Sequence, residues 1–166
     1  MILGMSVSTF TLVHVLLSLV GIFAGLVVVY GFLKGRLLEG WNGVFLVTTI
    51  LTSVTGFLFH SAQFGPPHFV GIISLVLLGF AVAALYAFNL AGPWRWIYAA
   101  TATLSLYLNV FVGVVQAFQK VSFLQPLAPT QSEPPFLIAQ GLVLVAFIVA
   151  GYLAVKRFHP PVALAT

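Results

Sequence analysis

Long apolar segments fill most of the sequence, and their length constrains the fold more than any other feature. A helix needs about 20 apolar residues to cross the roughly 30 Å hydrocarbon core of a bilayer. The segment 9–33 meets this requirement with room to tilt. Only 5% of the residues are charged, which leaves too little polar surface to cover a water-soluble globule. The sequence therefore predicts an all-α integral membrane protein.

Several such segments follow one another, separated by short stretches that contain proline, glycine or charged residues. We expect a single membrane domain over residues 1–166, a helical bundle with five transmembrane helices at about 9–33, 43–59, 69–90, 96–118 and 136–155. The second segment is short and rich in threonine, so it could be re-entrant instead of crossing. No basic residue precedes Lys34, so we expect the first segment to be retained as a span and not removed as a signal peptide.

An odd number of crossings places the two termini on opposite sides of the membrane, and the basic residues then separate by side. One side carries Lys34, Arg36, Arg95, Lys156 and Arg157, whereas the other carries Lys120 alone. Basic residues concentrate in cytoplasmic loops. The distribution therefore predicts the N-terminus outside and the C-terminus in the cytoplasm.

This topology also predicts a histidine-containing outer face. His14 lies near the outer end of the first segment, and His60 and His68 flank the connector 59–69. With Glu133 in the second outer loop, the candidate metal site comprises His14, His60, His68 and Glu133. Imidazole and carboxylate ligands without thiolate suit Cu, Zn or Fe, and haem is a weaker alternative. The spacing of His60 and His68 matches no recognised metal motif, so capping of helix ends is the simpler interpretation for that pair.

Polar and small residues recur at helical spacing in three segments, and they should turn inward because polar groups that face lipid are costly. The stripes are His14, Ser18, Gly21 and Gly25; Thr48, Thr52 and Thr55; and Ser105, Asn109, Gly113, Gln116 and Lys120. Gly21 and Gly25 have the spacing that lets membrane helices approach closely. The predicted polar interior includes Ser18, Asn109, Gln116 and Gln140. It serves either helix packing or a ligand cavity or polar path that opens outward.

Other chemistry is poorly represented in the sequence. It contains no cysteine, no glycine-rich phosphate loop and no serine-nucleophile motif. The two acidic residues, Glu39 and Glu133, fall on opposite sides of the predicted membrane, which equips a cation-driven transporter poorly. Six basic residues dispersed along an apolar chain form no nucleic-acid footprint. We therefore expect no nucleic-acid partner, and an enzymatic role is disfavoured.

Three stretches carry a resemblance to known proteins: VGIISLVLL, WRWIYAATATLSLYLNVFVGVVQAFQKVSFLQPLAP and PTQSEPPF. They resemble an uncharacterised family of small bacterial multi-pass inner-membrane proteins. The resemblance implies a bacterial inner (cytoplasmic) membrane. It brings no activity, cofactor or binding residue to this chain.

Two functions remain from these observations, with a third behind them. The first is a non-catalytic accessory or oligomeric membrane subunit, bound to the lipid bilayer and to copies or partners through outward-facing docking loops. The proline-containing loop from Lys120 to Pro135 is the main candidate for such docking, because prolines restrict its conformations. The second is a metal- or redox-cofactor-binding protein that uses the outer histidines. The third is a small-molecule transporter or channel.

Overall fold

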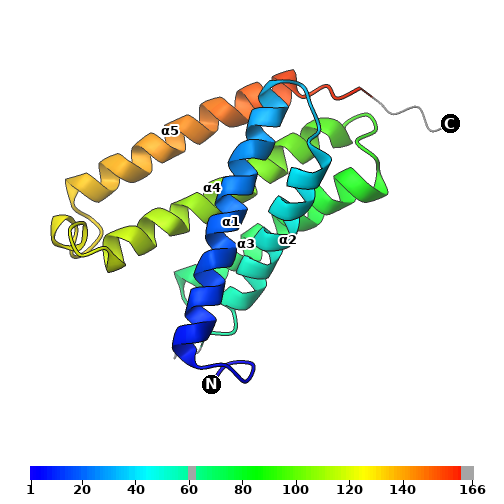
Figure 1. Ribbon diagram of the computed structural model, residues 1–166. Coiled ribbons are helices and arrows are strands. Elements are labelled where there is room, and N and C mark those ends of the chain that lie inside the picture. The colour runs from blue at the N-terminus through cyan, green and yellow to red at the C-terminus, as the bar shows by residue number, and fades with distance from the viewer. Residues whose placement is uncertain (60–62, 162–166) are drawn as a thin grey trace.

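A computed structural model describes residues 1–59 and 63–161, and helices account for most of this part of the chain. The long helices are α1 (Val7–Leu33), α2 (Glu39–Gly56), α3 (Pro66–Val82), α4 (Trp94–Lys120) and α5 (Pro134–Arg157) (Figure 1). A π-helical turn, η1 (Ala83–Ala87), continues α3, and a 3-10 turn, η2 (Gln125–Leu127), lies in the α4–α5 loop. No strand forms within the described residues, so the all-α prediction is confirmed there.

Four of the helical segments are long and apolar enough to cross a membrane. They are Val7–Leu33, Pro66–Ala87, Trp94–Lys120 and Pro134–Arg157. The prediction of a helical membrane bundle is confirmed to this extent. The helix α2 does not meet the same criterion, because polar residues at its start and threonines along its length lower its apolar character. The predicted crossing by 43–59 therefore stays a prediction.

The helices begin and end where the sequence supplies capping or helix-breaking residues. The Ser6 hydroxyl accepts a hydrogen bond from the Thr9 N–H at 3.1 Å and starts α1. Proline occupies the first turn of α3 and of α5, where its missing N–H costs nothing. After α1 the chain turns through Gly35 at φ +68°, and a Cβ there would lie 3.2 Å from the Arg157 carbonyl oxygen. Glycine therefore permits the end of α1 to contact the end of α5.

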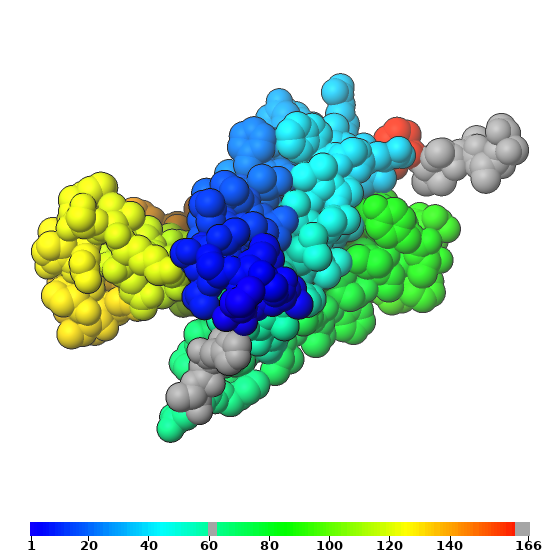
Figure 2. Space-filling view, turned by 60° about the horizontal axis from the view of Figure 1, so that its bottom comes forward, coloured from blue at the N-terminus to red at the C-terminus, as the bar shows by residue number. Residues whose placement is uncertain are grey.

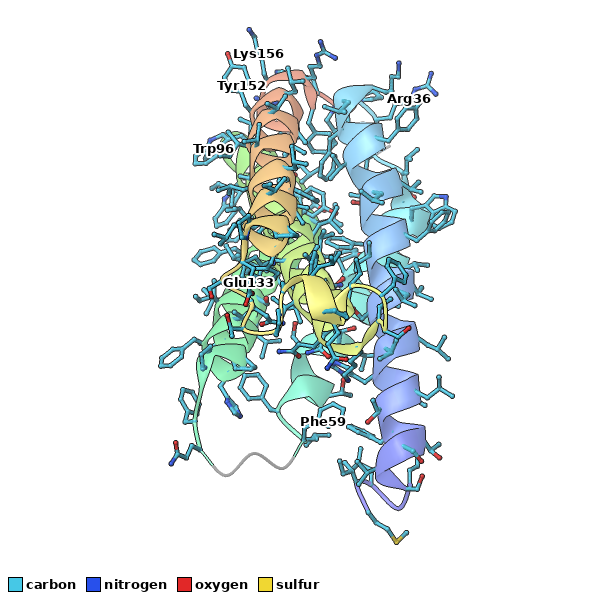
Figure 3. The ribbon with its side chains drawn as sticks, turned by 90° about the vertical axis from the view of Figure 1, so that its left-hand side faces the viewer. Arg36, Phe59, Trp96, Glu133, Tyr152 and Lys156 are labelled. Carbon is cyan, nitrogen blue, oxygen red and sulfur yellow. The ribbon has the colours of Figure 1, made fainter. Side chains whose placement is uncertain are left out.

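One end of the bundle holds an aromatic cluster that ties α1, α2, α4 and the segment after α5 together. The rings of Phe32, Tyr98 and Phe158 lie within 4.6 to 6.1 Å of each other, centroid to centroid. The buried Tyr98 hydroxyl donates to Asn42 Oδ1, and the Asn42 amide donates to the Leu38 carbonyl at 2.7 Å. We call this the basic end, because it carries Lys34, Arg36, Arg95, Lys156 and Arg157; Figure 3 labels Arg36 and Lys156 there.

The helices diverge away from the basic end. In Figure 1 the end of α5 lies beside the end of α1, whereas the start of α5 and the α4–α5 loop lie far from the start of α1. Phe59 lies at the opposite extreme from Arg36 in Figure 3. We call the region of the N-terminus, Phe59 and the start of α3 the histidine end. The α4–α5 pair therefore forms an arm of its own, separate from the histidine end.

Candidate functional site

A hydrogen bond between α1 and α2 holds the His14 side chain. His14 Nδ1 lies 2.8 Å from Thr55 Oγ1, and the Thr55 hydroxyl in turn donates to the Leu51 carbonyl at 2.7 Å. A hydroxyl has one hydrogen to donate, so His14 Nδ1 must be the donor in the first bond. The imidazole is thereby fixed in the tautomer that leaves Nε2 without a hydrogen when the ring is neutral. The Phe59 ring and the imidazole pack nearly perpendicular to each other, with centroids 5.1 Å apart.

One turn further along the same face of α1, Ser18 connects α1 to α4. Its hydroxyl donates to Asn109 Oδ1 at 2.9 Å, and Asn109 Nδ2 lies 3.5 Å from the Ser18 carbonyl oxygen. The Asn109 side chain is 8% exposed although it lies in the middle of an apolar helix. Both side chains therefore face the contact between α1 and α4.

Gly21 brings α1 close enough to α2 and α4 for three polar atoms to surround its backbone. A Cβ at Gly21 would lie 3.0 Å from Thr49 Oγ1, 3.2 Å from Thr48 Oγ1 and 3.3 Å from Asn109 Nδ2. The buried Thr49 hydroxyl has no hydrogen-bond partner among the described residues. We call His14, Ser18, Thr48, Thr49, Thr55 and Asn109 the polar cluster. It occupies the place where α1, α2 and α4 meet.

Gly25 completes the close approach at the next turn of α1. A Cβ there would lie 2.5 Å from Leu106 Cδ1 and 2.9 Å from Phe45 Cδ2, closer than carbon atoms pack. The interpretation of Gly21 and Gly25 as a helix-packing pair is therefore confirmed. Both glycines leave room for α2 on one side and α4 on the other.

Of the remaining predicted interior residues, Gln140 is half-buried and Gln116 is exposed. Gln140 connects α5 to α4 through a 3.1 Å hydrogen bond from its Nε2 to the Phe111 carbonyl, while its buried Oε1 has no partner within the described part of the chain. Gln116 is exposed, contrary to the expectation of an interior position. It lies two turns beyond Asn109 on the same stripe of α4.

His68 caps a helix. Its Nδ1 accepts a hydrogen bond from the Gly65 N–H at 3.1 Å at the start of α3, and its ring stacks on Phe64 with centroids 4.8 Å apart. The capping interpretation is thus confirmed for His68. The side chain also lines an open hollow of about 510 Å³ with residues 1–3 and 57–59. His60 lies outside the described residues.

Glu133 organises the α4–α5 loop, residues 121–133. Its carboxylate accepts hydrogen bonds from the Thr130 hydroxyl at 2.8 Å, the Thr130 N–H at 3.1 Å and the Ser132 N–H at 3.1 Å. These donors, the Thr130 hydroxyl above all, lower the pKa of the Glu133 carboxyl below its ordinary value. The carboxylate therefore stays ionised and bound to the loop at neutral pH.

The described part of the chain contains no assembled set of ligands at the predicted metal site. No three histidine, aspartate or glutamate side chains come together among residues 1–59 and 63–161. Glu133 lies on the α4–α5 arm, which diverges from the histidine end (Figures 1 and 3). Because His60 is outside the described residues, the full set of His14, His60, His68 and Glu133 stays a prediction.

The α4–α5 loop is folded on a small core of its own. Phe118, Ala128 and Phe136 are buried together, with the two phenyl rings 5.5 Å apart edge to face. The Gln131 side chain donates to the Val115 carbonyl at 3.1 Å and fastens the loop to α4. Figure 2 shows the loop, in yellow, as a projection at one side of the molecule. Its surface carries the apolar side chains of Phe123, 73% exposed, and Leu127, 49% exposed.

Comparison with known proteins assigns no family to this chain: no family model, curated protein or solved structure shows significant similarity to it. Sequence reasoning missed the Asn42–Tyr98 bond at the basic end. The signal was present in an asparagine and a tyrosine near the starts of two apolar segments, but their pairing depends on how α2 and α4 pack.

Proposed function

We propose that this chain is a non-catalytic subunit of a bacterial inner-membrane assembly and that its α4–α5 loop contacts another membrane protein. The observation that carries the proposal is an ordered loop with exposed apolar side chains at its surface. Phe123 and Leu127 are held on a loop that three hydrogen bonds to Glu133 and a small buried core keep folded. A preorganised surface loses little conformational entropy on binding.

The arrangement of α2 supports five crossings. It begins just after Arg36 at the basic end, and Phe59 follows it at the opposite extreme of the molecule (Figure 3). Its 18 residues span about 27 Å at 1.5 Å per residue, close to the thickness of a bilayer core. Several of its threonines donate back to carbonyls of the same helix, including Thr48 to Val44 and Thr52 to Thr48. A helix whose hydroxyls are bonded internally tolerates a membrane interior.

The basic end supports the orientation. Five of the six lysines and arginines gather there, and only Lys120 lies at the far end of α4. By the positive-inside rule the basic end faces the cytoplasm. The N-terminus, the histidine end and the α4–α5 loop then face outward. The partner of the loop is accordingly an inner-membrane protein with an apolar surface at or near the outer leaflet.

The polar cluster has a structural part in this proposal. Four of its six side chains pair across three helices, His14 with Thr55 and Ser18 with Asn109, whereas the Thr49 hydroxyl has no partner among the described residues. Such pairs hold membrane helices together. In a transporter, by contrast, such polar side chains would bind the solute as it passes through the protein.

A metal- or redox-cofactor function is the second candidate, and one observation favours it. His14 Nδ1 donates to Thr55, which is how protein groups orient the ring of a metal-binding histidine and present Nε2 to the metal. Cu, Zn or Fe would suit that nitrogen. Elemental analysis and an absorption spectrum of the purified protein decide this point. A stoichiometric metal that is lost in His14→Ala would replace the first proposal with the second.

Photo-crosslinking tests the partner contact. A photoreactive amino acid at position 123 is expected to give a discrete protein adduct in native membranes, and Leu127→Ser should reduce its yield. The matched control is position 142 on α5, where Leu142 is 68% exposed on a helix that faces lipid. If position 123 gives only the lipid adducts that position 142 gives, Phe123 inserts into the bilayer surface and the partner proposal fails.

A further inference from the structure

A groove runs between α4 and α5 on the outside of the bundle. It has a volume of about 380 Å³ and is lined by side chains between residues 100 and 107 on α4 and between 144 and 155 on α5. Nearly all of these side chains are apolar or aromatic. The exception, Thr103, donates its hydroxyl to the Ala99 carbonyl of its own helix at 2.7 Å. Because the Thr103 hydroxyl is already hydrogen-bonded within its own helix, the lining of the groove suits an apolar ligand.

The length of the groove matches one leaflet of a membrane. Residues 144 to 155 cover about 16 Å along α5 at 1.5 Å per residue, and half of a 30 Å hydrocarbon core is about 15 Å. The groove starts near the middle of α5 and ends at Val155, at the basic end. Three of its lining side chains on α5 are exposed, Leu144 at 43%, Ile148 at 61% and Tyr152 at 65%, so the groove opens to the outside of the bundle.

A positive charge lies at the end of the groove. Tyr152 lines the groove, and the Lys156 ammonium lies over the Tyr152 ring, 5.7 Å from its centroid. Figure 3 shows Lys156 and Tyr152 at this end of the molecule, with Trp96 on the same side and nearer its middle. Trp96 is one turn before the first groove residue of α4, and tryptophan favours the headgroup level of a membrane.

We infer that this groove binds one acyl chain of an anionic phospholipid from the leaflet at the basic end, with the headgroup phosphate held at Lys156. The apolar lining receives the chain, and the groove length accommodates the part of it that crosses one leaflet. The Lys156 ammonium lies at the end of the groove, beside Tyr152, where it meets the phosphate. The inference goes beyond the partner contact proposed above, because that contact lies at the other end of the α4–α5 arm.

The charge at the groove favours a lipid over a second copy of the chain. Two copies packed through this face by a two-fold axis would place the same patch of each against the other. Lys156 and Arg157 of both copies would then come together without an acidic side chain in α5 to balance them. An anionic headgroup removes this repulsion.

Lipid titration followed by native mass spectrometry tests the inference. The purified protein in mild detergent is titrated with phosphatidylglycerol or with phosphatidylethanolamine of the same acyl chains. We expect one site that prefers phosphatidylglycerol by about fivefold, which corresponds to about 1 kcal/mol for one basic side chain near a headgroup. Lys156→Gln should remove the preference. Lys34→Gln should keep it, although Lys34 lies over Tyr30 at the same 5.7 Å, because that pair is on α1.

Filling the groove tests the position of the acyl chain. Gly151 lines the groove, so Gly151→Leu should abolish tight binding of both lipids. Gly141→Leu is the matched control, since Gly141 is on the same helix with nothing within 4 Å of its Cβ position and does not line the groove. Lys156→Gln alters only a surface side chain and keeps the test decisive if Gly151→Leu fails to fold.

Three results would overturn the inference. The first is equal binding of both lipids with no effect of Lys156→Gln, which indicates ordinary boundary lipid. The second is unchanged binding in a folded Gly151→Leu variant. The third is a wild-type dimer that retains no lipid and dissociates on Gly151→Leu, which assigns the groove to a second copy.

Discussion

His14 on α1 donates its Nδ1 hydrogen to Thr55 on α2 across 2.8 Å, although 41 residues separate the two in sequence. The bond lies toward the histidine end of the bundle, away from the aromatic cluster of the basic end. Together with the Phe59 ring, which packs against both Phe10 and His14, the bond fixes the spacing of α1 and α2 at this end. It also determines which imidazole nitrogen is available to a ligand.

Removal of the Thr55 hydroxyl should destabilise the bundle measurably. Thr55→Val keeps the shape of the side chain but leaves the His14 Nδ1–H without its acceptor. Hydrogen bonds between membrane helices contribute about 0.6 kcal/mol on average and up to about 1.7, and we expect a loss in this range from unfolding in mixed micelles. Thr11→Val is the control, because the exposed Thr11 hydroxyl bonds only to the Val7 carbonyl of its own helix. Equal losses in the two variants would assign His14 no part in helix pairing.

Ser18 and Asn109 should be energetically coupled. We expect a double-mutant cycle of Ser18→Ala and Asn109→Ala to give a coupling energy of about 0.6 to 1.7 kcal/mol, since the two side chains share a 2.9 Å hydrogen bond. The same cycle between Ser18→Ala and Thr101→Val should give none, because the Thr101 hydroxyl bonds within α4. Additivity in both cycles would show that the Ser18–Asn109 bond contributes nothing to helix association.

Gly25 should tolerate no larger side chain. In Gly25→Leu the Cβ of the new side chain would lie 2.5 Å from Leu106 Cδ1 on α4 and 2.9 Å from Phe45 Cδ2 on α2. The helices α1, α2 and α4 must therefore separate locally. Overpacking of a filled core costs about 1 to 3 kcal/mol, which unfolding measurements on the purified protein can resolve. Gly79→Leu provides the comparison, since a Cβ at Gly79 meets nothing within 4 Å. A Gly25→Leu variant as stable as Gly79→Leu would contradict the close approach of α1 and α4.

The α4–α5 loop should loosen at acidic pH. The pKa of Glu133 is lower in the folded loop than its ordinary value of 4.5, mainly because the Thr130 hydroxyl donates to the carboxylate. The ionised Glu133 carboxylate therefore stabilises the loop fully at any pH above 4.5. This stabilisation is lost as the pH falls through the lower pKa that the carboxyl has in the folded loop. Limited proteolysis of residues 121–133 across this range should show increasing cleavage toward acid. Glu133→Ala should be cleaved readily at every pH, and a wild-type loop that resists acid would assign its order to the Phe118–Phe136 core.

The lengths and apolar character of the helices could be predicted from sequence because both are local properties. The stripe of His14, Ser18, Gly21 and Gly25 also identified the buried face of α1, since helical spacing alone places these residues together. The predicted ends of the first and fourth segments fall within a few residues of the ends of α1 and α4.

The angle between the helices could not be predicted, because packing at the basic end determines it. Phe32, Tyr98 and Phe158 converge there from three parts of the chain, and the α4–α5 arm diverges from α1 at the other end. Asn109 is buried while Gln116, two turns further on the same stripe, is exposed, a difference that helical spacing does not reveal. The divergence also places Glu133 away from the histidine end, a separation that a count of crossings does not reveal.

Cysteine accessibility in intact cells tests the five-crossing topology most directly, and the chain has no natural cysteine to interfere. Single cysteines at Ser8, Arg36, Ser132 and His159 are treated with a membrane-impermeant maleimide before and after permeabilisation. The account predicts that Ser8→Cys and Ser132→Cys react from outside, whereas Arg36→Cys and His159→Cys react only after permeabilisation. Labelling of Ser8→Cys and Ser132→Cys from opposite sides of the membrane would contradict it.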